Sequence, residues 1–233
     1  MSMNNILFKF FNKYSFLALI LLLVPFILYS QDSATNISGV WWRTGITGPP
    51  GSNISVIEPR VLSDFGTELM NQFDPIDDPA VRCEHPGAVR VILSPYPIKI
   101  EKNISNIIIQ YEEWATTRNI PFNNNYLGFA QGEENNKSVM GKSVAFIQDG
   151  KLIIKTNHLS NGLGRIKGQF LWLSDKAEIV EEYSTNQDQM LVLRITINDP
   201  VMLEKPFIIQ KHWGSYEGEL LSFDCIDRER PQT

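Results

Sequence analysis

The sequence predicts an all-β fold, an antiparallel meander of about 8–10 strands that closes on itself as a barrel, with one short helix near its start. From Val89 onward, apolar and polar residues largely alternate, which is the periodicity of a strand with one buried face. Turn residues separate the alternating runs at short intervals, and only one segment has helical spacing. A curved open sheet or a sandwich is the alternative architecture.

The first 30 residues have the pattern of a secretory signal peptide. Lys9 and Lys13 precede an uncharged run, and its most apolar part, Phe16–Leu28, is shorter than the about 20 residues that a bilayer span needs. Cleavage is expected near Ser30. The mature protein is then periplasmic or secreted, and contact with a membrane is expected only through this segment if it stays uncleaved.

Residues 31–233 are long enough for one domain with a substantial core. The leader carries two lysines and no acidic residue, so its removal changes the formal net charge from −5 to −7. A chain this acidic lacks the basic footprint on which nucleic-acid binding depends. We therefore expect no nucleic-acid partner.

The elements follow in order along the chain. "GVWWRTG" (39–45) is a first strand, and within 55–73 Ser63 is a good N-cap for a helix whose apolar residues recur every fourth position, Phe65, Leu69 and Phe73. Later strands are expected in the runs 96–101, 106–114, 116–122, 142–148, 151–156, 177–184, 190–198, 206–213 and 219–225. Asp149–Gly150 suits a type I′ hairpin turn. The low-complexity stretch 122–138 is expected to be a flexible loop at a barrel mouth.

The two cysteines are expected to form a disulfide. Cys83 lies in "DDPAVRCEHPG" (77–87) and Cys225 near the end of the chain, and an exported protein meets oxidising conditions. This segment is then a rigid loop whose course its prolines set. A free nucleophilic Cys83 is the weaker alternative, because no other feature of the sequence marks it as activated.

"QYEEWATTR" (110–118) holds the candidate acid–base residues. On a strand, Glu112 and Glu113 point to opposite faces, so one of them is expected to point into the barrel, where burial would raise its pKa and suit it to proton transfer. Arg118 and His158 are the candidate supporting residues. The alternative is that the inward glutamate only forms an ion pair with Arg118, Arg43 or Arg90.

Aromatic residues are the candidate ligand-binding residues: Trp41, Trp42, Tyr96, Tyr111, Trp114 and Trp213. Large rings lining a barrel would form an apolar pocket for a small apolar molecule, and they would fill a solid barrel equally well. Alternation places only one of Trp41 and Trp42 inside. The histidines His85, His158 and His212 lie in separate segments, so no metal site is expected, and no glycine-rich nucleotide motif indicates a cofactor.

Several segments in this order resemble a family of exported bacterial proteins described as lipocalin-like β-barrels: "GVWW", "FDPIDDPAVRCEHPG", "SPYPIKI", "IIIQYEEW", "DGKLIIKTNHL", "INDPVMLEKPF" and "LLSFDC". The resemblance covers about residues 38–226 and implies a barrel fold and export, with no established reaction or ligand. The residues that match the family pattern are Asp78, Arg82, Cys83, Pro86, Gly87, Pro95, Tyr96, Pro97, Tyr111, Glu112, Arg118, His158, Asp199, Pro200 and Cys225. The chain departs from the pattern at Gly141-Lys142-Ser143, at "FIQDGK" and at "PFNNN", which lowers the expectation of an enzyme.

Three functions remain open from the sequence. The first is an exported barrel that binds a small, mostly apolar ligand inside. The second is a cofactor-independent enzyme that uses acid–base chemistry in the barrel cavity, and the third is a structural or interaction protein with a filled barrel.

Overall fold

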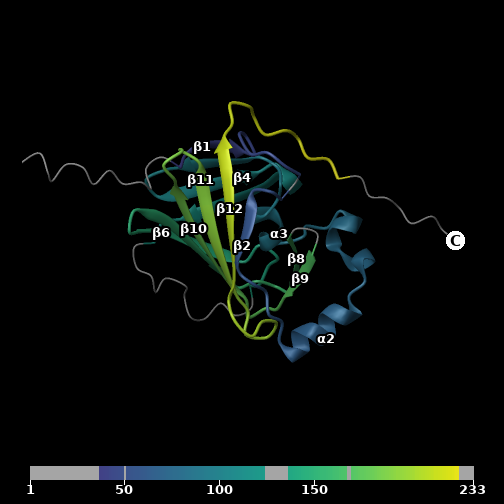
Figure 1. The fold of residues 1–233 in the computed structure, drawn as a ribbon. Coiled ribbons are helices and arrows are strands. Elements are labelled where there is room, and N and C mark those ends of the chain that lie inside the picture. Colours follow the sequence, from purple (N-terminus) through teal and green to yellow (C-terminus); the bar gives the residue numbers. More distant parts are fainter. Residues whose placement is uncertain (1–36, 50, 124–135, 167–168, 226–233) are drawn as a thin grey trace, which may run out of the picture.

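The computed structural model describes residues 37–49, 51–123, 136–166 and 169–225, and these residues form the expected all-β barrel (Figure 1). One sheet contains ten strands, nine of which follow one another around the nearly closed barrel. The strands are β1 (Gly39–Trp42), β2 (Ile54–Glu58), β3 (Ile98–Lys102), β4 (Asn106–Tyr111), β5 (Thr116–Pro121), β6 (Lys142–Gln148), β7 (Lys151–Asn157), β8 (Gly162–Ile166), β9 (Gln169–Leu173), β10 (Glu178–Thr185), β11 (Leu191–Asn198) and β12 (Phe207–Ser215).

The strand order around the barrel repeats the chain order, with β2 and the separate β8–β9 hairpin left aside. The last strand, β12, pairs with the first, β1, and all eight neighbouring pairs on the path are antiparallel. With nine strands, the two at the ends of the path then run in the same direction. Accordingly, β5 and β6 meet through a parallel bridge between Phe122 and Ala145. A parallel neighbour needs a long connection, which accounts for the length of chain between β5 and β6.

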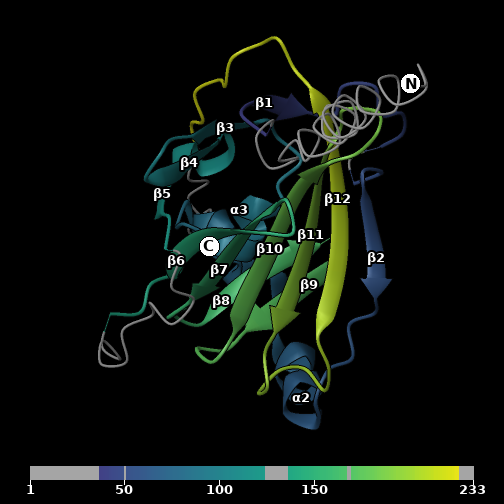
Figure 2. The same cartoon turned by 90° about the vertical axis from the view of Figure 1, so that its left-hand side faces the viewer.

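Alternation fills the barrel with apolar side chains. On β11, the odd-numbered residues Leu191 to Ile197 are completely buried, and β3, β4 and β10 alternate in the same way. The helix α3 (Ala88–Ile92) belongs to the same hydrophobic cluster. Figure 2 shows it between the β3–β5 side of the barrel and the β10–β12 side. The inner face of the sheet is therefore engaged in packing.

The wall of the barrel divides at β12. The first half of β12 pairs with β2, and its last residues pair with β1 instead. Because β1 continues the sheet to β3 and β2 pairs with β12 alone, the two strands leave β12 in different directions. This division positions the cleft described below.

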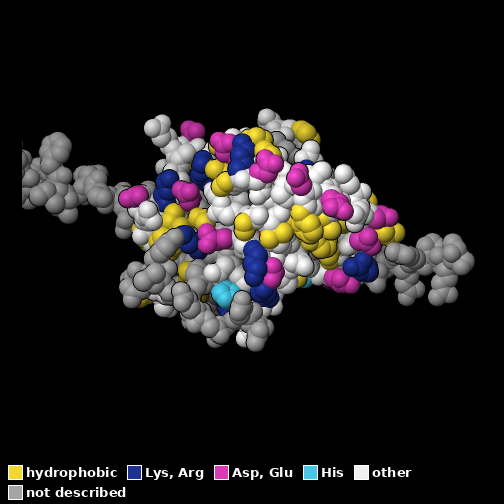
Figure 3. Space-filling model, turned by 90° about the horizontal axis from the view of Figure 1, so that it is seen from below, with side chains coloured by type: hydrophobic (Ala, Val, Ile, Leu, Met, Phe, Trp, Pro, Cys, Tyr) yellow, Lys and Arg dark blue, Asp and Glu magenta, His cyan; other side chains and the backbone are white. Residues whose placement is uncertain are grey.

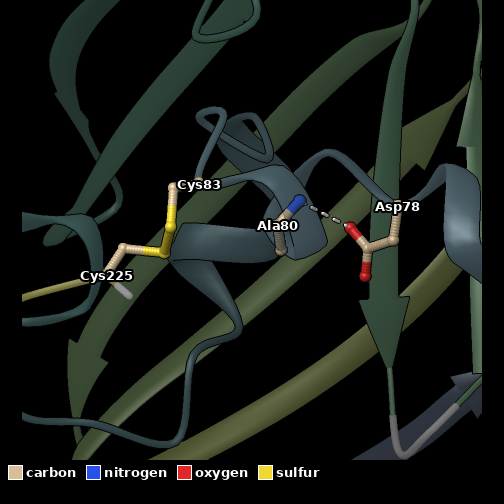
Figure 4. The surroundings of a disulfide bond; sticks show 4 residues. All are labelled: Asp78, Ala80, Cys83 and Cys225. Atoms are coloured by element: carbon tan, nitrogen blue, oxygen red, sulfur yellow. Dashed lines mark hydrogen bonds between the residues drawn. A yellow bond between two sulfur atoms is a disulfide. The ribbon is translucent and has the colours of Figure 1, made fainter. Parts of the chain in front are cut away.

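The segment that leads into the barrel is a series of short turns. Ser63 caps α2 (Asp64–Gln72) by accepting a hydrogen bond from the Gly66 amide, at 2.9 Å, as predicted. Two 3-10 turns follow, η3 (Pro75–Asp77) and η4 (Pro79–Arg82), each with proline in its first turn and an aspartate cap. The predicted disulfide between Cys83 and Cys225 is present, and Figure 4 shows it beside the Asp78 cap of η4.

Three predictions need correction, and three strands were not predicted. Residues 88–92 form α3 and not a strand, because every side chain except Arg90 is buried in the core. The strand predicted at 106–114 ends at Tyr111, and the 3-10 turn η5 (Glu113–Ala115) then redirects the chain. The run 219–225 is irregular. Residues 54–58, 162–166 and 169–173 form strands that were not predicted from the sequence.

Of the other predictions, some are confirmed and some fall on residues that the structure does not describe. The hairpins 142–156 and 177–199 are confirmed, and Asp149 and Gly150 both have the positive φ of a type I′ turn. The leader, its cleavage point and most of the loop 122–138 lie outside the described residues. None of the helices in the described part of the chain is long and apolar enough to cross a lipid bilayer.

Candidate functional site

A cleft with a volume of about 600 Å³ opens between the connection that leads from β1 into β2 and the segment between α3 and β3. On one side it is bounded by the chain that enters β2, on the other by the segment from α3 to β3, with η5 and β8 completing the wall. Its volume is within the range that holds a small organic ligand. The lining residues are Pro49, Gly51, Ser52, Ile54, Arg90, Leu93, Ser94, Pro95, Tyr96, Glu113 and Arg165.

Glu113 contributes the one carboxylate of this lining. Its side chain is only 9% exposed, and among the described residues its buried Oε2 has no hydrogen-bond partner. The turn that carries it is fixed at its start, since the amide of Glu112 donates to the carbonyl of Pro97 at 3.1 Å. A buried acceptor without a partner costs about 1–3 kcal/mol, so a ligand that donated a hydrogen bond here would recover that free energy.

Lys211 lies beneath the cleft. Its side chain points inward from β12 and is completely buried, and the residue pairs in register with Ile54 of the cleft wall. The ammonium donates to the carbonyls of Ser94 and Ile92 at the end of α3, and lies 4.2 Å from the ring centroid of Trp213. Burial lowers the pKa of Lys211 to about 7, against an opposing effect of the Glu113 charge. Near neutral pH, its amine is therefore partly protonated.

The two arginines of the cleft differ in their surroundings. Arg90 is half-buried and forms an ion pair with the buried carboxylate of Asp78, at 3.1 Å, so its charge is balanced within the protein. Arg165 is exposed on β8, with its guanidinium 5.2 Å from the centroid of the Phe170 ring. Arg165 is thus the cation that the cleft presents to solvent.

A second polar cluster lies inside the barrel. Arg118 of β5 forms a bidentate ion pair with Glu181 of β10, with nitrogen–oxygen distances of 2.8 and 3.1 Å, and both side chains are almost completely buried. Arg118 also donates to the hydroxyl oxygens of Ser143, Thr156 and Tyr111. These contacts reach β6, β7 and β4, so one side chain joins the strands on both sides of the junction between β5 and β6.

The barrel cluster keeps its protons near neutral pH. Burial raises the pKa of Tyr111 to about 12 and that of Tyr183 well above its ordinary value. For Arg118, burial acts to lower the pKa, but the charge of Glu181 outweighs it and the pKa is raised. The hydroxyl of Tyr183 donates to Glu181 at 2.8 Å, so the carboxylate is shared among several donors. This arrangement suits a structural cross-link better than proton transfer.

The structure places the four candidate acid–base residues apart. Glu113 lines the cleft, whereas the Oε2 of Glu112 accepts a hydrogen bond from the amide of Leu221, at 2.9 Å. Arg118 lies inside the barrel. His158 lines a separate cavity of about 240 Å³ together with Lys137 and Asp175. Neither glutamate is paired with Arg118, because the strand ends before either could point inward.

The structure also places the candidate ligand-binding aromatic residues in different parts of the protein. Tyr96 lines the cleft and is 44% exposed. Trp41, Tyr111 and Trp213 are buried in the core, while Trp42 is partly exposed on the outer side, as alternation within β1 requires. Trp114 packs between other rings beside the cleft wall, against His85 and Phe223.

Glu181, Lys211 and Arg165 were not predicted as site residues from the sequence. A signal for the first two was present, since Glu181 shares its strand face with Ile179 and Tyr183, and Lys211 with Ile209 and Trp213. Arg165 lies on a hairpin that was not assigned. Among the described residues, no three metal-binding side chains are grouped. On the face shown in Figure 3, acidic and basic side chains are interspersed around a hydrophobic patch.

No known protein-family model matches this chain, and no curated protein matches it either. The chemistry of the site is therefore argued from its own geometry.

Proposed function

We propose that the protein is an exported barrel that binds a small, largely apolar ligand in the cleft between the β1–β2 connection and the α3–β3 segment. The unpartnered carboxylate of Glu113, at the wall of a cleft of about 600 Å³, carries this proposal. The site lies beside the barrel axis, because the inner face of the sheet is occupied by packed side chains and α3.

The lining indicates the character of the ligand. Ile54, Leu93, Pro95 and Tyr96 offer apolar surface to most of a small molecule. Glu113 would accept a hydrogen bond from a hydroxyl or N–H group, and Arg165 would attract an acidic group at the rim. A ligand with an apolar body and at least one hydrogen-bond donor fits this arrangement. Sites that hydrogen-bond such a group discriminate strongly against analogues that lack it.

Export is part of the same proposal. It is supported by the signal-peptide pattern of residues 1–30 and by the disulfide, a bond that persists in oxidising compartments.

Native mass spectrometry of the protein purified from its own host tests the binding function. We expect a noncovalent adduct with the mass of a small organic molecule. Ser52→Trp places a large ring in the cleft and should abolish the adduct. Ser55→Trp, on an exposed position of β2 outside the lining, is the matched control and should retain it. The absence of any adduct, or an adduct that survives Ser52→Trp, would contradict the proposal and favour a structural or interaction role.

Acid–base catalysis in the same cleft is the second candidate. One observation favours it: Lys211, which is buried behind Ile54 of the cleft wall, is close enough for its pKa, lowered by burial to about 7, to respond to the Glu113 charge. The two candidates separate once the bound molecule is identified. A binding protein releases it unchanged after prolonged incubation, whereas an enzyme converts it to a product, and Glu113→Gln would then stop conversion.

A further inference from the structure

Residues 216–225, which we call the strap, leave the end of β12 and cross above β1 toward the β3–β4 side of the barrel (Figure 2). At its start, the amide of Tyr216 donates to the carbonyl of Val40 at 2.9 Å, and the Tyr216 ring meets the Trp42 ring edge-on. Further along, the amide of Leu221 donates to the side chain of Glu112. The Phe223 ring packs against Trp114, with centroids 5.0 Å apart, before the strap ends at Cys225. The strap thus contacts the residues on both sides of Glu113.

The turn that the strap contacts is conformationally strained. Trp114 has φ 63° and Ala115 has φ 43°, both in the left-handed region that residues with a side chain rarely adopt. Such a residue costs on the order of 1–3 kcal/mol and persists where the surrounding structure enforces it. Two of them in succession, directly after Glu113, require an external constraint.

The constraint acts from two sides. Phe223 lies against one part of the Trp114 ring and His85 against another, at a centroid distance of 6.3 Å. Nε2 of His85 is 2.9 Å from Oγ1 of Thr116, the residue that follows the turn. Nδ1 of His85 accepts from the amide of Gly87, so Nε2 carries the proton and donates to Thr116. The disulfide joins the segment that carries His85 to the strap that carries Phe223 (Figure 4).

We propose that the disulfide-tethered strap is a positioning element of the cleft. It holds the strained turn so that the carboxylate of Glu113 stays at the cleft wall, with Glu112 as the residue through which it acts. The effect of the strap on ligand binding rests on the proposed ligand-binding function. The hold of the strap on the turn is tested separately. It assigns to the Cys83 segment a role in the site as well as in stability.

The test compares Glu112→Ala with Glu112→Gln. Alanine removes the acceptor for the Leu221 amide, whereas glutamine keeps a carbonyl oxygen at the same place and serves as the matched control. Hydrogen exchange is measured in peptides covering 112–116 and the strap. In Glu112→Ala we expect exchange there to be faster by on the order of tenfold, with β10 and β11 unchanged, and exchange in Glu112→Gln to remain close to wild type.

The second readout is binding of the fluorescent probe 1-anilinonaphthalene-8-sulfonate. It combines apolar rings, one N–H donor and a sulfonate. Only the part of its signal that Ser52→Trp abolishes counts as cleft binding. Glu112→Ala, and the Cys83→Ser/Cys225→Ser double variant, should weaken this binding by on the order of tenfold while the barrel keeps its far-UV circular dichroism.

The outcomes distinguish the two proposals. Unchanged exchange in both Glu112→Ala and the double cysteine variant would overturn the positioning role. Faster exchange with unchanged probe affinity would also overturn it, because the strap would then hold the turn without affecting the cleft. If wild type shows no probe signal that Ser52→Trp abolishes, the cleft fails as a site for such a ligand, while the exchange data still decide whether the strap holds the turn.

Discussion

Arg118 is the residue that best explains how this barrel closes. Among the described residues, the backbone contact at the junction of β5 and β6 is one parallel bridge, between Phe122 and Ala145, which includes the hydrogen bond from the amide of Asn123 to the carbonyl of Ala145. Arg118 replaces the missing ladder by reaching from β5 across the junction to three strands, β6, β7 and β10, through hydroxyl and charged partners. A planar guanidinium with several fixed donors is suited to this role, whereas lysine would satisfy fewer partners.

Glu181→Gln should therefore be strongly destabilising. It removes the charge that balances buried Arg118, and breaking a buried pair typically costs about 3–5 kcal/mol of unfolding free energy. Urea unfolding followed by circular dichroism measures it. Glu101→Gln is the control, because its pair with Lys99 is exposed and should change stability by less than about 1 kcal/mol. A loss in Glu181→Gln as small as that of the control would show that the cluster does not close the barrel.

At the residue scale, the sequence predicted that only one of Trp41 and Trp42 points inward, which cysteines pair and which residue caps α2. It did not predict where Glu113 lies. Alternation alone cannot show that a strand ends at Tyr111, because the two left-handed residues that follow are Trp114 and Ala115, neither of which marks such a turn. Two distant segments, the strap and the segment that carries His85, impose this conformation. The local sequence therefore does not predict it.

At the scale of elements, α3 and β12 are held together by Lys211. The carbonyls at the end of α3 have no further helical turn to pair with, and the Lys211 ammonium supplies the donor from inside the barrel. Since α3 is fully packed in the core, this contact fixes the floor of the cleft relative to β12. Because burial lowers the pKa of the Lys211 amine, the charge of this amine changes with pH in the folded protein.

The unfolding free energy should consequently rise with pH above neutrality. The folded pKa of Lys211 is about 7 and the ordinary lysine value is 10.5, so between these values the unfolded chain binds more protons than the folded one. Stability then increases with pH in this window, by up to about 1.4 kcal/mol per unit, and falls as the pH returns towards 7.

Urea unfolding between pH 7.5 and 9.5 checks this expectation, with Lys211→Met as the comparison. The variant lacks the titrating amine and should show a flatter profile in this range. A wild-type profile as flat as that of the variant would mean that Lys211 does not lose its proton on burial.

The helix α3 was missed because the cue is tertiary. "AVRVI" is rich in β-branched residues and reads as a strand by propensity, yet every residue except Arg90 packs into the hydrophobic cluster as a short helix. The hairpins, by contrast, carry their own turn residues and alternation, so β6–β7 and β10–β11 were predictable from local sequence alone.

For the whole molecule, the main features follow from the division of the sheet at β12. Nine strands in chain order build the barrel, and their odd number makes β5 and β6 parallel. The sequence predicted this ring in outline, but it did not predict that the first half of β12 would pair with β2 and not with β1. The candidate site lies at that division and not on the barrel axis, which is why the predicted pocket residues are mostly core residues.

The most direct measurement is a crystal structure of the protein purified from its own host, or soaked with a molecule that this preparation carries. We predict electron density for a small organic molecule in the cleft, against Tyr96 and Leu93, with a donor group within hydrogen-bond distance of Glu113. Density for the molecule along the barrel axis among Tyr111, Arg118 and Tyr183, with the cleft left to solvent, would contradict it.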